Sequence, residues 1–114
     1  MDEITNLQAE VLKVLANPRR LDILHRVAEE PMEVGRLAAE LGMTQPNVSQ
    51  HLAILRTAGL VDATREGREI RYRIADPDVI VACGVMRNVL ERRLARLARL
   101  ADTNRLSDLL IPVS

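Results

Sequence analysis

The sequence predicts a mainly helical (α) fold that also contains one short β hairpin. Tyr72 is the only aromatic residue among 114, so the core must consist of aliphatic side chains, which suit packed helices. Apolar residues recur at helical spacing over most of the chain, and a period of two appears only between residues 60 and 74. The length suits a single domain that spans residues 1–114.

The first three expected helices have marked ends. Residues 1–16 carry an amphipathic pattern, and Asn17 then caps a second helix that begins at Pro18. A third helix over residues 33–41 ends on Gly42, because glycine adopts the left-handed conformation that commonly follows a helix. The apolar faces of these helices are expected to share one core.

The fourth helix is the element around which the others are organised. Thr44 suits its N-cap, and Gly59 suits the left-handed position after its last turn. Together with the third helix, it forms a predicted helix-turn-helix over residues 33–58. In this motif the second helix enters the major groove of DNA. Its outward face is small and polar, and such side chains bond base edges or phosphates, although a polar face alone is commonly only solvated. The candidate DNA contacts on this helix are Thr44, Gln45, Asn47, Ser49 and Gln50.

Residues 60–74 predict a β hairpin directly after the fourth helix. Gly67 suits the tight turn at its tip, and Ile70 is expected to face inward with the alternate apolar residues that follow it. A hairpin in this position is a wing, and arginines on a wing reach phosphates or the minor groove. The alternative is that these arginines form surface ion pairs with carboxylates such as Glu66 and Glu69. The candidate wing contacts are Arg65, Arg68 and Arg71.

The longest expected helix spans residues 76–101. Asp76 caps its start and Pro77 follows in the first turn. Its apolar stripe is wider than its own domain can cover, and residues 1–16 are equally apolar. These two helices therefore predict a homodimer interface. A tail with apolar positions follows over residues 102–114.

Charge and composition restrict the classes of function. The formal net charge is zero, but residues 44–74 carry five basic and three acidic side chains, so the predicted DNA-binding elements are locally basic. No apolar run is long enough to span a membrane, and the N-terminus lacks a signal-peptide pattern. We therefore expect a cytoplasmic protein with no membrane partner. The lone Cys83 is consistent with a reducing compartment.

Six segments of the chain match one known pattern in the same order. They are LANPRRLDIL (15–24), LAAELG (37–42), NVSQHL (47–52), LR (55–56), AGLV (58–61) and GREIRYRI (67–74). In this combination the sequence closely resembles the ArsR/SmtB family of bacterial winged helix-turn-helix repressors. The resemblance implies a homodimer that binds an imperfect inverted repeat near a promoter and is released by an inducer. It also implies that Gln45, Ser49 and Gln50 touch bases or phosphates and that Arg68 lies at the wing tip.

The positions that hold inducing metals in members of that family carry other residues here. A Cys-x-Cys pair on the third helix is replaced by Glu33 and Gly35, and a cysteine pair late in the fourth helix by Ile54 and Ala58. The last helix, over residues 76–101, contains no histidine. The sequence therefore predicts no metal site and no cofactor, and the inducer stays unknown.

Cys83 is the one chemically distinctive group on the predicted dimerisation helix. One interpretation is a small apolar packing residue, because free cysteine is among the most buried residue types. The other is a redox or thiol sensor formed by Cys83 of both subunits. In that case a non-metal, thiol-directed signal relieves repression.

The leading interpretation is a sequence-specific transcriptional repressor that binds double-stranded DNA as a homodimer. The alternative is a winged-helix module for protein interaction or dimerisation without specific DNA readout, which the neutral net charge favours slightly. An enzyme is not expected. The sequence has no paired carboxylates, no nucleophile beside a base and no glycine-rich phosphate loop in a suitable context.

Overall fold

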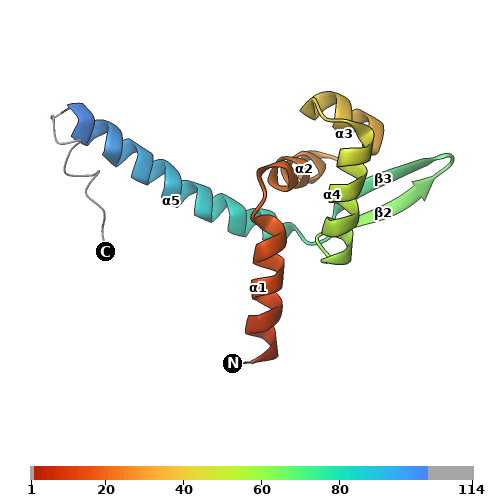
Figure 1. The fold of residues 1–114 in the computed structure, drawn as a ribbon, viewed down its shortest axis with the longest axis horizontal. Coiled ribbons are helices and arrows are strands. Elements are labelled where there is room, and N and C mark those ends of the chain that lie inside the picture. The colour runs from red at the N-terminus through yellow and green to blue at the C-terminus, as the bar shows by residue number, and fades with distance from the viewer. Residues whose placement is uncertain (1, 103–114) are drawn as a thin grey trace. The chain divides into compact units, whose positions relative to one another are not determined.

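A computed structural model describes residues 2–102, which form five helices and three short strands (Figure 1). The helices are α1 (Glu3–Leu15), α2 (Pro18–Glu29), α3 (Val34–Leu41), α4 (Gln45–Thr57) and α5 (Pro77–Asp102). The strands are β1 (Met32–Glu33), β2 (Val61–Glu66) and β3 (Glu69–Ile74). Of the described residues, those from Asp2 to Ile80 form one compact unit, and those from Val81 to Asp102 belong to a second. The predicted tail lies outside the described residues, apart from Asp102 at the end of α5.

The helix ends are set by the capping residues that the sequence marks. The Asn17 carboxamide oxygen accepts hydrogen bonds from two N–H groups in the first turn of α2, at 3.0 and 3.2 Å. The Thr44 hydroxyl oxygen accepts a hydrogen bond from the Asn47 N–H at 3.3 Å. Gly42 and Gly59 follow α3 and α4 with φ of 63° and 78°, where a β-carbon would be strained. The predicted start of α2, end of α3 and both ends of α4 are confirmed.

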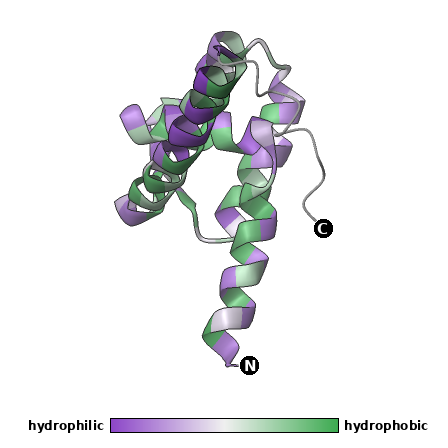
Figure 2. Cartoon of the chain, turned by 90° about the vertical axis from the view of Figure 1, so that its left-hand side faces the viewer, coloured by the Kyte–Doolittle hydropathy of each residue, from purple (hydrophilic) through white to green (hydrophobic). Residues whose placement is uncertain are grey.

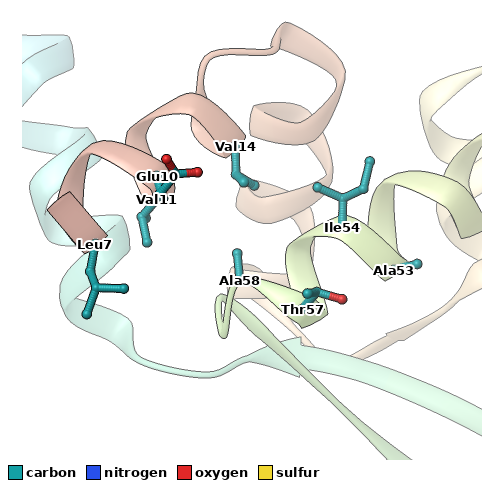
Figure 3. Close-up of a pocket in the computed structure, with 8 residues that line it drawn as sticks. All are labelled: Leu7, Glu10, Val11, Val14, Ala53, Ile54, Thr57 and Ala58. Atoms are coloured by element: carbon teal, nitrogen blue, oxygen red, sulfur yellow. The ribbon is translucent and has the colours of Figure 1, made fainter.

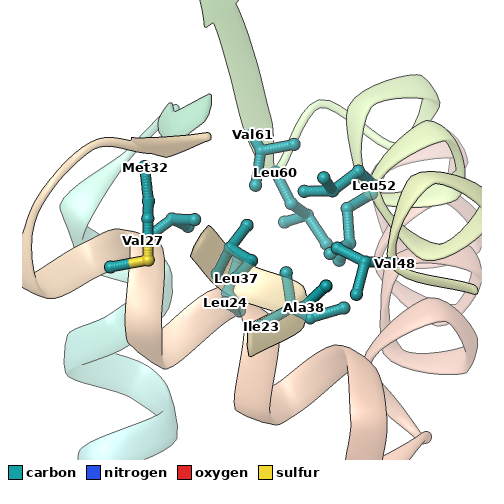
Figure 4. Packing of buried hydrophobic residues seen from close by; sticks show 11 residues of the cluster. Ile23, Leu24, Val27, Met32, Leu37, Ala38, Val48, Leu52, Leu60 and Val61 are labelled. Carbon is teal, nitrogen blue, oxygen red and sulfur yellow. The ribbon is translucent and has the colours of Figure 1, made fainter. Parts of the chain in front are cut away.

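A single aliphatic core joins α2, α3, α4 and the base of the hairpin (Figure 4). Val48, Leu52 and Leu55 enter it from α4 and are fully buried, as their spacing predicts. Burying one such side chain stabilises the fold by about 1.5–3 kcal/mol. The buried cluster comprises Ile23, Leu24, Val27, Met32, Leu37, Ala38, Val48, Leu52, Leu55, Leu60 and Val61. This core fixes which face of α4 remains exposed.

The predicted hairpin belongs to a three-stranded antiparallel sheet with the order β1-β3-β2. Met32 and Glu33 of β1 pair with Tyr72 and Arg71 of β3. The third helix, expected from about Glu33, begins at Val34, and Glu33 occupies its N-cap without making a side-chain capping bond. A strand of two residues shows no alternation in sequence, so only its pairing with β3 reveals it.

The prediction that Ile70 faces inward is wrong. Ile70 lies opposite Arg65 in the hairpin and is 45% exposed. Val61 and Ile74, opposite each other at the base of the same face, are buried and half-buried respectively. Side chains therefore alternate between the two faces of the hairpin as expected. The hairpin, however, is longer than the core beneath it, and its tip projects from the helices of its unit (Figure 1).

Two helices expose apolar side chains that the core leaves uncovered. On α1, which has no buried residue, Ile4, Leu7 and Leu12 are 55–73% exposed. Figure 2 shows apolar and polar residues interspersed along this helix. On α5, in the second unit, the exposed apolar residues are Val81, Val85, Met86, Val89, Leu90 and Leu94. Such surfaces mark sites of association.

Candidate nucleic-acid interface

The outward face of α4 is polar and open. Gln45, Ser49 and Gln50 are exposed on it, and their amide and hydroxyl groups both donate and accept hydrogen bonds. Asn47 and the capping Thr44 are exposed beside them. The helix contains no carboxylate that would repel a phosphate. The structure therefore places all five predicted contacts of this segment on accessible surface at one helix and its cap.

One face of the hairpin is occupied by internal ion pairs. Glu66 Oε2 lies 3.1 Å from Arg71 Nε, and Glu66 Oε1 lies 3.4 Å from Arg73 Nη2. Glu69 lies 3.8 Å from Arg71, and Arg73 donates a hydrogen bond to the Thr64 hydroxyl at 2.9 Å. Arg71, a predicted DNA contact, is thus already paired with two carboxylates of the wing.

The other two predicted wing arginines keep their charge uncompensated. Arg68 follows Gly67 in the turn, and Arg65 donates from Nε to the Gly67 carbonyl at 3.4 Å. Within the described part of the chain neither guanidinium forms an ion pair. Both side chains are exposed, so the tip of the wing is a cationic point suited to a phosphate.

Ion pairs also join α2 to α3. Arg36 of α3 pairs with Glu40 on its own helix and with Glu30 at the end of α2. Arg26 of α2 lies 3.3 Å from Glu40. Hydrogen bonds with Glu40 and then Glu30 raise the pKa of Arg36 above its ordinary value. These arginines hold two helices together and do not provide free charge for a ligand.

His51 is a half-buried residue of α4. Burial lowers the pKa of His51, and the charges of Arg20 and Arg19 lower it further, which favours the neutral imidazole. Its Nδ1 has no hydrogen-bond partner among the described residues. Arg20 donates a hydrogen bond to the Val14 carbonyl at 3.0 Å and so connects α2 to the end of α1.

A groove of about 690 Å³ lies between α1 and the last turns of α4 (Figure 3). Leu7, Val11 and Val14 contribute to one wall, and Ile54 and Ala58 contribute to the other. The lining is mainly aliphatic. Three sides of α4 are therefore distinct: one packs in the core, one faces this groove, and one is polar and open.

The structure shows the surroundings of two further residues, Cys83 and Gly35. Cys83 is a half-buried free thiol on α5. Gly35, at the start of α3, lies against the side chain of Gln45, a contact that no sequence pattern signals.

Among residues 2–102, no group of three histidine, cysteine, aspartate or glutamate side chains gathers at metal-binding distance. No helix in that range is long and apolar enough to cross a membrane.

Sequence comparisons relate the chain to bacterial regulators. Residues 17–63 match the model of a family described as bacterial regulatory protein, arsR family. The chain is 41% identical over 103 residues to the uncharacterised HTH-type transcriptional regulator Rv0081 of Mycobacterium tuberculosis, covering 89% of this chain and 90% of that protein. It is 45% identical over 74 residues to the HTH-type transcriptional repressor SmtB of the same organism, covering 65% of this chain and 55% of that protein.

Solved structures share the fold. The crystal structure of Rv0081 of M. tuberculosis superposes with a TM-score of 0.77 at 38% identity, covering 86% of this chain and 99% of that one. The solution structure of the homodimeric winged helix-turn-helix DNA-binding domain of Mb0332 from Mycobacterium bovis gives a TM-score of 0.75 at 36% identity, covering 82% and 86%.

Proposed function

Because the chain belongs to the ArsR family of bacterial regulatory proteins, we propose that it places two copies of α4 in successive major grooves of an inverted-repeat operator. The protein is a DNA-binding transcriptional repressor that works as a homodimer. The observation that carries the proposal is the open polar face of α4 beside a cationic wing tip. A protein-interaction module has no need of either feature and is not favoured.

The proposed contacts divide into two kinds. Gln45, Ser49 and Gln50 bond base edges or adjacent phosphates, with Thr44 and Asn47 at the margin of the same face. On the wing, Arg65 and Arg68 bind the backbone or the minor groove. Arg71 joins them only where a phosphate displaces Glu66. The wing therefore supplies affinity, and α4 supplies sequence discrimination.

The proposed dimer interface consists of α1 and α5. Both helices expose aliphatic side chains, and a second copy offers the same surface in return, as two-fold symmetry requires. The half-sites of the operator then lie about one helical turn of DNA apart. A repressor binds the chromosome, so we expect this protein to act in the cytoplasm.

Gln50→Ala and Arg68→Ala test the two kinds of contact. We expect Gln50→Ala to cost about 1–3 kcal/mol of specific binding per half-site, because an amide pair to a base edge is lost. We expect Arg68→Ala to weaken specific and non-specific binding alike and to reduce the salt dependence by about one phosphate contact per subunit. Fluorescence anisotropy at several salt concentrations measures both, using a duplex that the wild-type protein enriches from randomised DNA and a scrambled duplex.

Equal losses on both duplexes from both variants would contradict this division of roles. Gln50 and Arg68 are both exposed, so neither change disturbs the core. Thermal unfolding of each variant verifies that the folded structure is retained.

Glu66→Gln is expected to strengthen non-specific DNA binding. The change removes the carboxylate that Arg71 and Arg73 share. Arg71 keeps only its longer pair with Glu69, and Arg73 keeps only its hydrogen bond to Thr64, so both guanidinium groups carry more uncompensated charge for a phosphate. Affinity for the scrambled duplex should rise about threefold to tenfold, with a steeper salt dependence. Glu29→Gln is the matched control, because Glu29 is exposed on α2 and forms no ion pair among the described residues. Equal gains from both variants would mean that net charge alone is responsible.

A further inference from the structure

The backbone conformation at position 35 does not require glycine. It is the second residue of α3, and its φ lies outside the left-handed region in which Gly42, Gly59 and Gly67 are found. Glycine is also a poor helix former compared with alanine. Neither a turn nor helix propensity therefore accounts for Gly35, and the reason must be sought in what lies next to it.

The neighbour of Gly35 is the side chain of Gln45. A β-carbon built on Gly35 would lie 3.3 Å from Gln45 Nε2, closer than ordinary van der Waals contact. The amide nitrogen of Gln45 therefore lies where a side chain at position 35 would crowd it, and one of the two would have to shift by a few tenths of an ångström. Gln45 begins α4, so this contact links the first turns of the two helices of the helix-turn-helix.

The first turn of α3 is open to such an approach. Glu33 occupies its N-cap but forms no side-chain capping bond, and α3 has no acidic residue in its first turn. A side-chain amide that rests against this backbone is confined on one side by α3 and remains exposed on the other.

We propose that Gly35 is a positioning residue for Gln45. Its missing side chain lets the Gln45 amide rest against α3, so that the amide is presented to DNA in one orientation. An alanine at position 35 displaces that amide by a few tenths of an ångström or forces it into another rotamer. This inference rests on the proposed function, because it assigns to Gly35 an effect on the readout made by Gln45.

A double-mutant cycle tests the proposal on the homodimer. Gly35→Ala, Gln45→Ala and the double variant are titrated by anisotropy on the enriched duplex and on duplexes with single base-pair changes in the half-site. We expect Gly35→Ala to weaken binding about threefold to tenfold, as one hydrogen-bonding contact is disturbed, and to relax discrimination at one position. In the Gln45→Ala background Gly35→Ala should have no effect on affinity.

The matched control is Ala39→Gly. Ala39 is exposed on α3, and this change alters helix propensity without approaching Gln45. It should leave base preference unchanged, whereas Gly35→Ala should change base preference while thermal stability is kept or raised. The side-chain amide resonances of Gln45 in nitrogen–proton correlation spectra, assigned from the Gln45→Ala variant, should shift in free Gly35→Ala.

Each adverse outcome has a separate meaning. A loss of affinity that persists in the double variant would show that the new methyl group obstructs DNA directly, and it would overturn the proposal. Unshifted Gln45 resonances in Gly35→Ala would also overturn it. If Gln45→Ala alone leaves affinity and base preference unchanged, the proposed DNA contact of Gln45 fails, while the resonance shift still decides whether Gly35 positions the amide.

Discussion

Replacing Leu94 by glutamate is expected to convert the homodimer into a monomer and to weaken operator binding about a hundredfold or more. Leu94 is 64% exposed in the single chain and lies on the apolar face of α5. If that face meets a second copy, a carboxylate there must be buried without a partner, which is far more costly than leaving it in water. The two α4 helices then bind their half-sites independently, and the dimer's gain in affinity from binding both half-sites at once is lost.

Asn88→Glu provides the control for this experiment. Asn88 is exposed on α5 and lies outside the apolar stripe, so the same added charge should remain in water. Light scattering after gel filtration gives the oligomeric state of both variants, and anisotropy gives their affinity for the enriched duplex. A Leu94→Glu variant that stays dimeric and binds the duplex normally would exclude α5 from the interface.

Most of the helical fold could be predicted because its signals are local. Asn17 and Thr44 cap helices through bonds to residues two or three positions away, and Gly42 and Gly59 end helices through their own backbone conformation. The buried face of α4 follows from helical spacing. The candidate contacts on α4 then follow by exclusion, since a helix packed on one face exposes the other.

What could not be predicted depends on contacts between distant parts of the chain. The strand β1 exists because Met32 and Glu33 pair with β3, some forty residues later. The exposure of Ile70 depends on where the core ends, which alternation alone does not reveal. The pairing of Arg71 with Glu66 needs the register of the hairpin, so the sequence offered DNA contact and surface ion pairing as alternatives. The contact between Gly35 and Gln45 is likewise visible only in three dimensions.

Leu52→Ala is expected to lower the free energy of unfolding by about 2–5 kcal/mol. Leu52 is completely buried, and it enters the core from α4 beside Val48 (Figure 4). Leu55 of the same helix is buried as well. Its truncation removes aliphatic contacts and leaves a cavity that the surrounding helices fill only in part. Urea unfolding at one fixed protein concentration measures the change, since the stability of a dimer depends on concentration.

Gln50→Ala on the same helix is the counterpart to this variant. Gln50 is exposed, so its replacement should change stability by no more than about 0.5 kcal/mol while it weakens specific binding. Leu52→Ala should show the reverse at a temperature where it stays folded, with stability lost and base preference retained. Because the two residues lie two positions apart on α4, this contrast separates the face that supports the helix from the face that reads DNA. A stable Leu52→Ala variant, or a Gln50→Ala variant that unfolds, would show that α4 is turned differently about its axis.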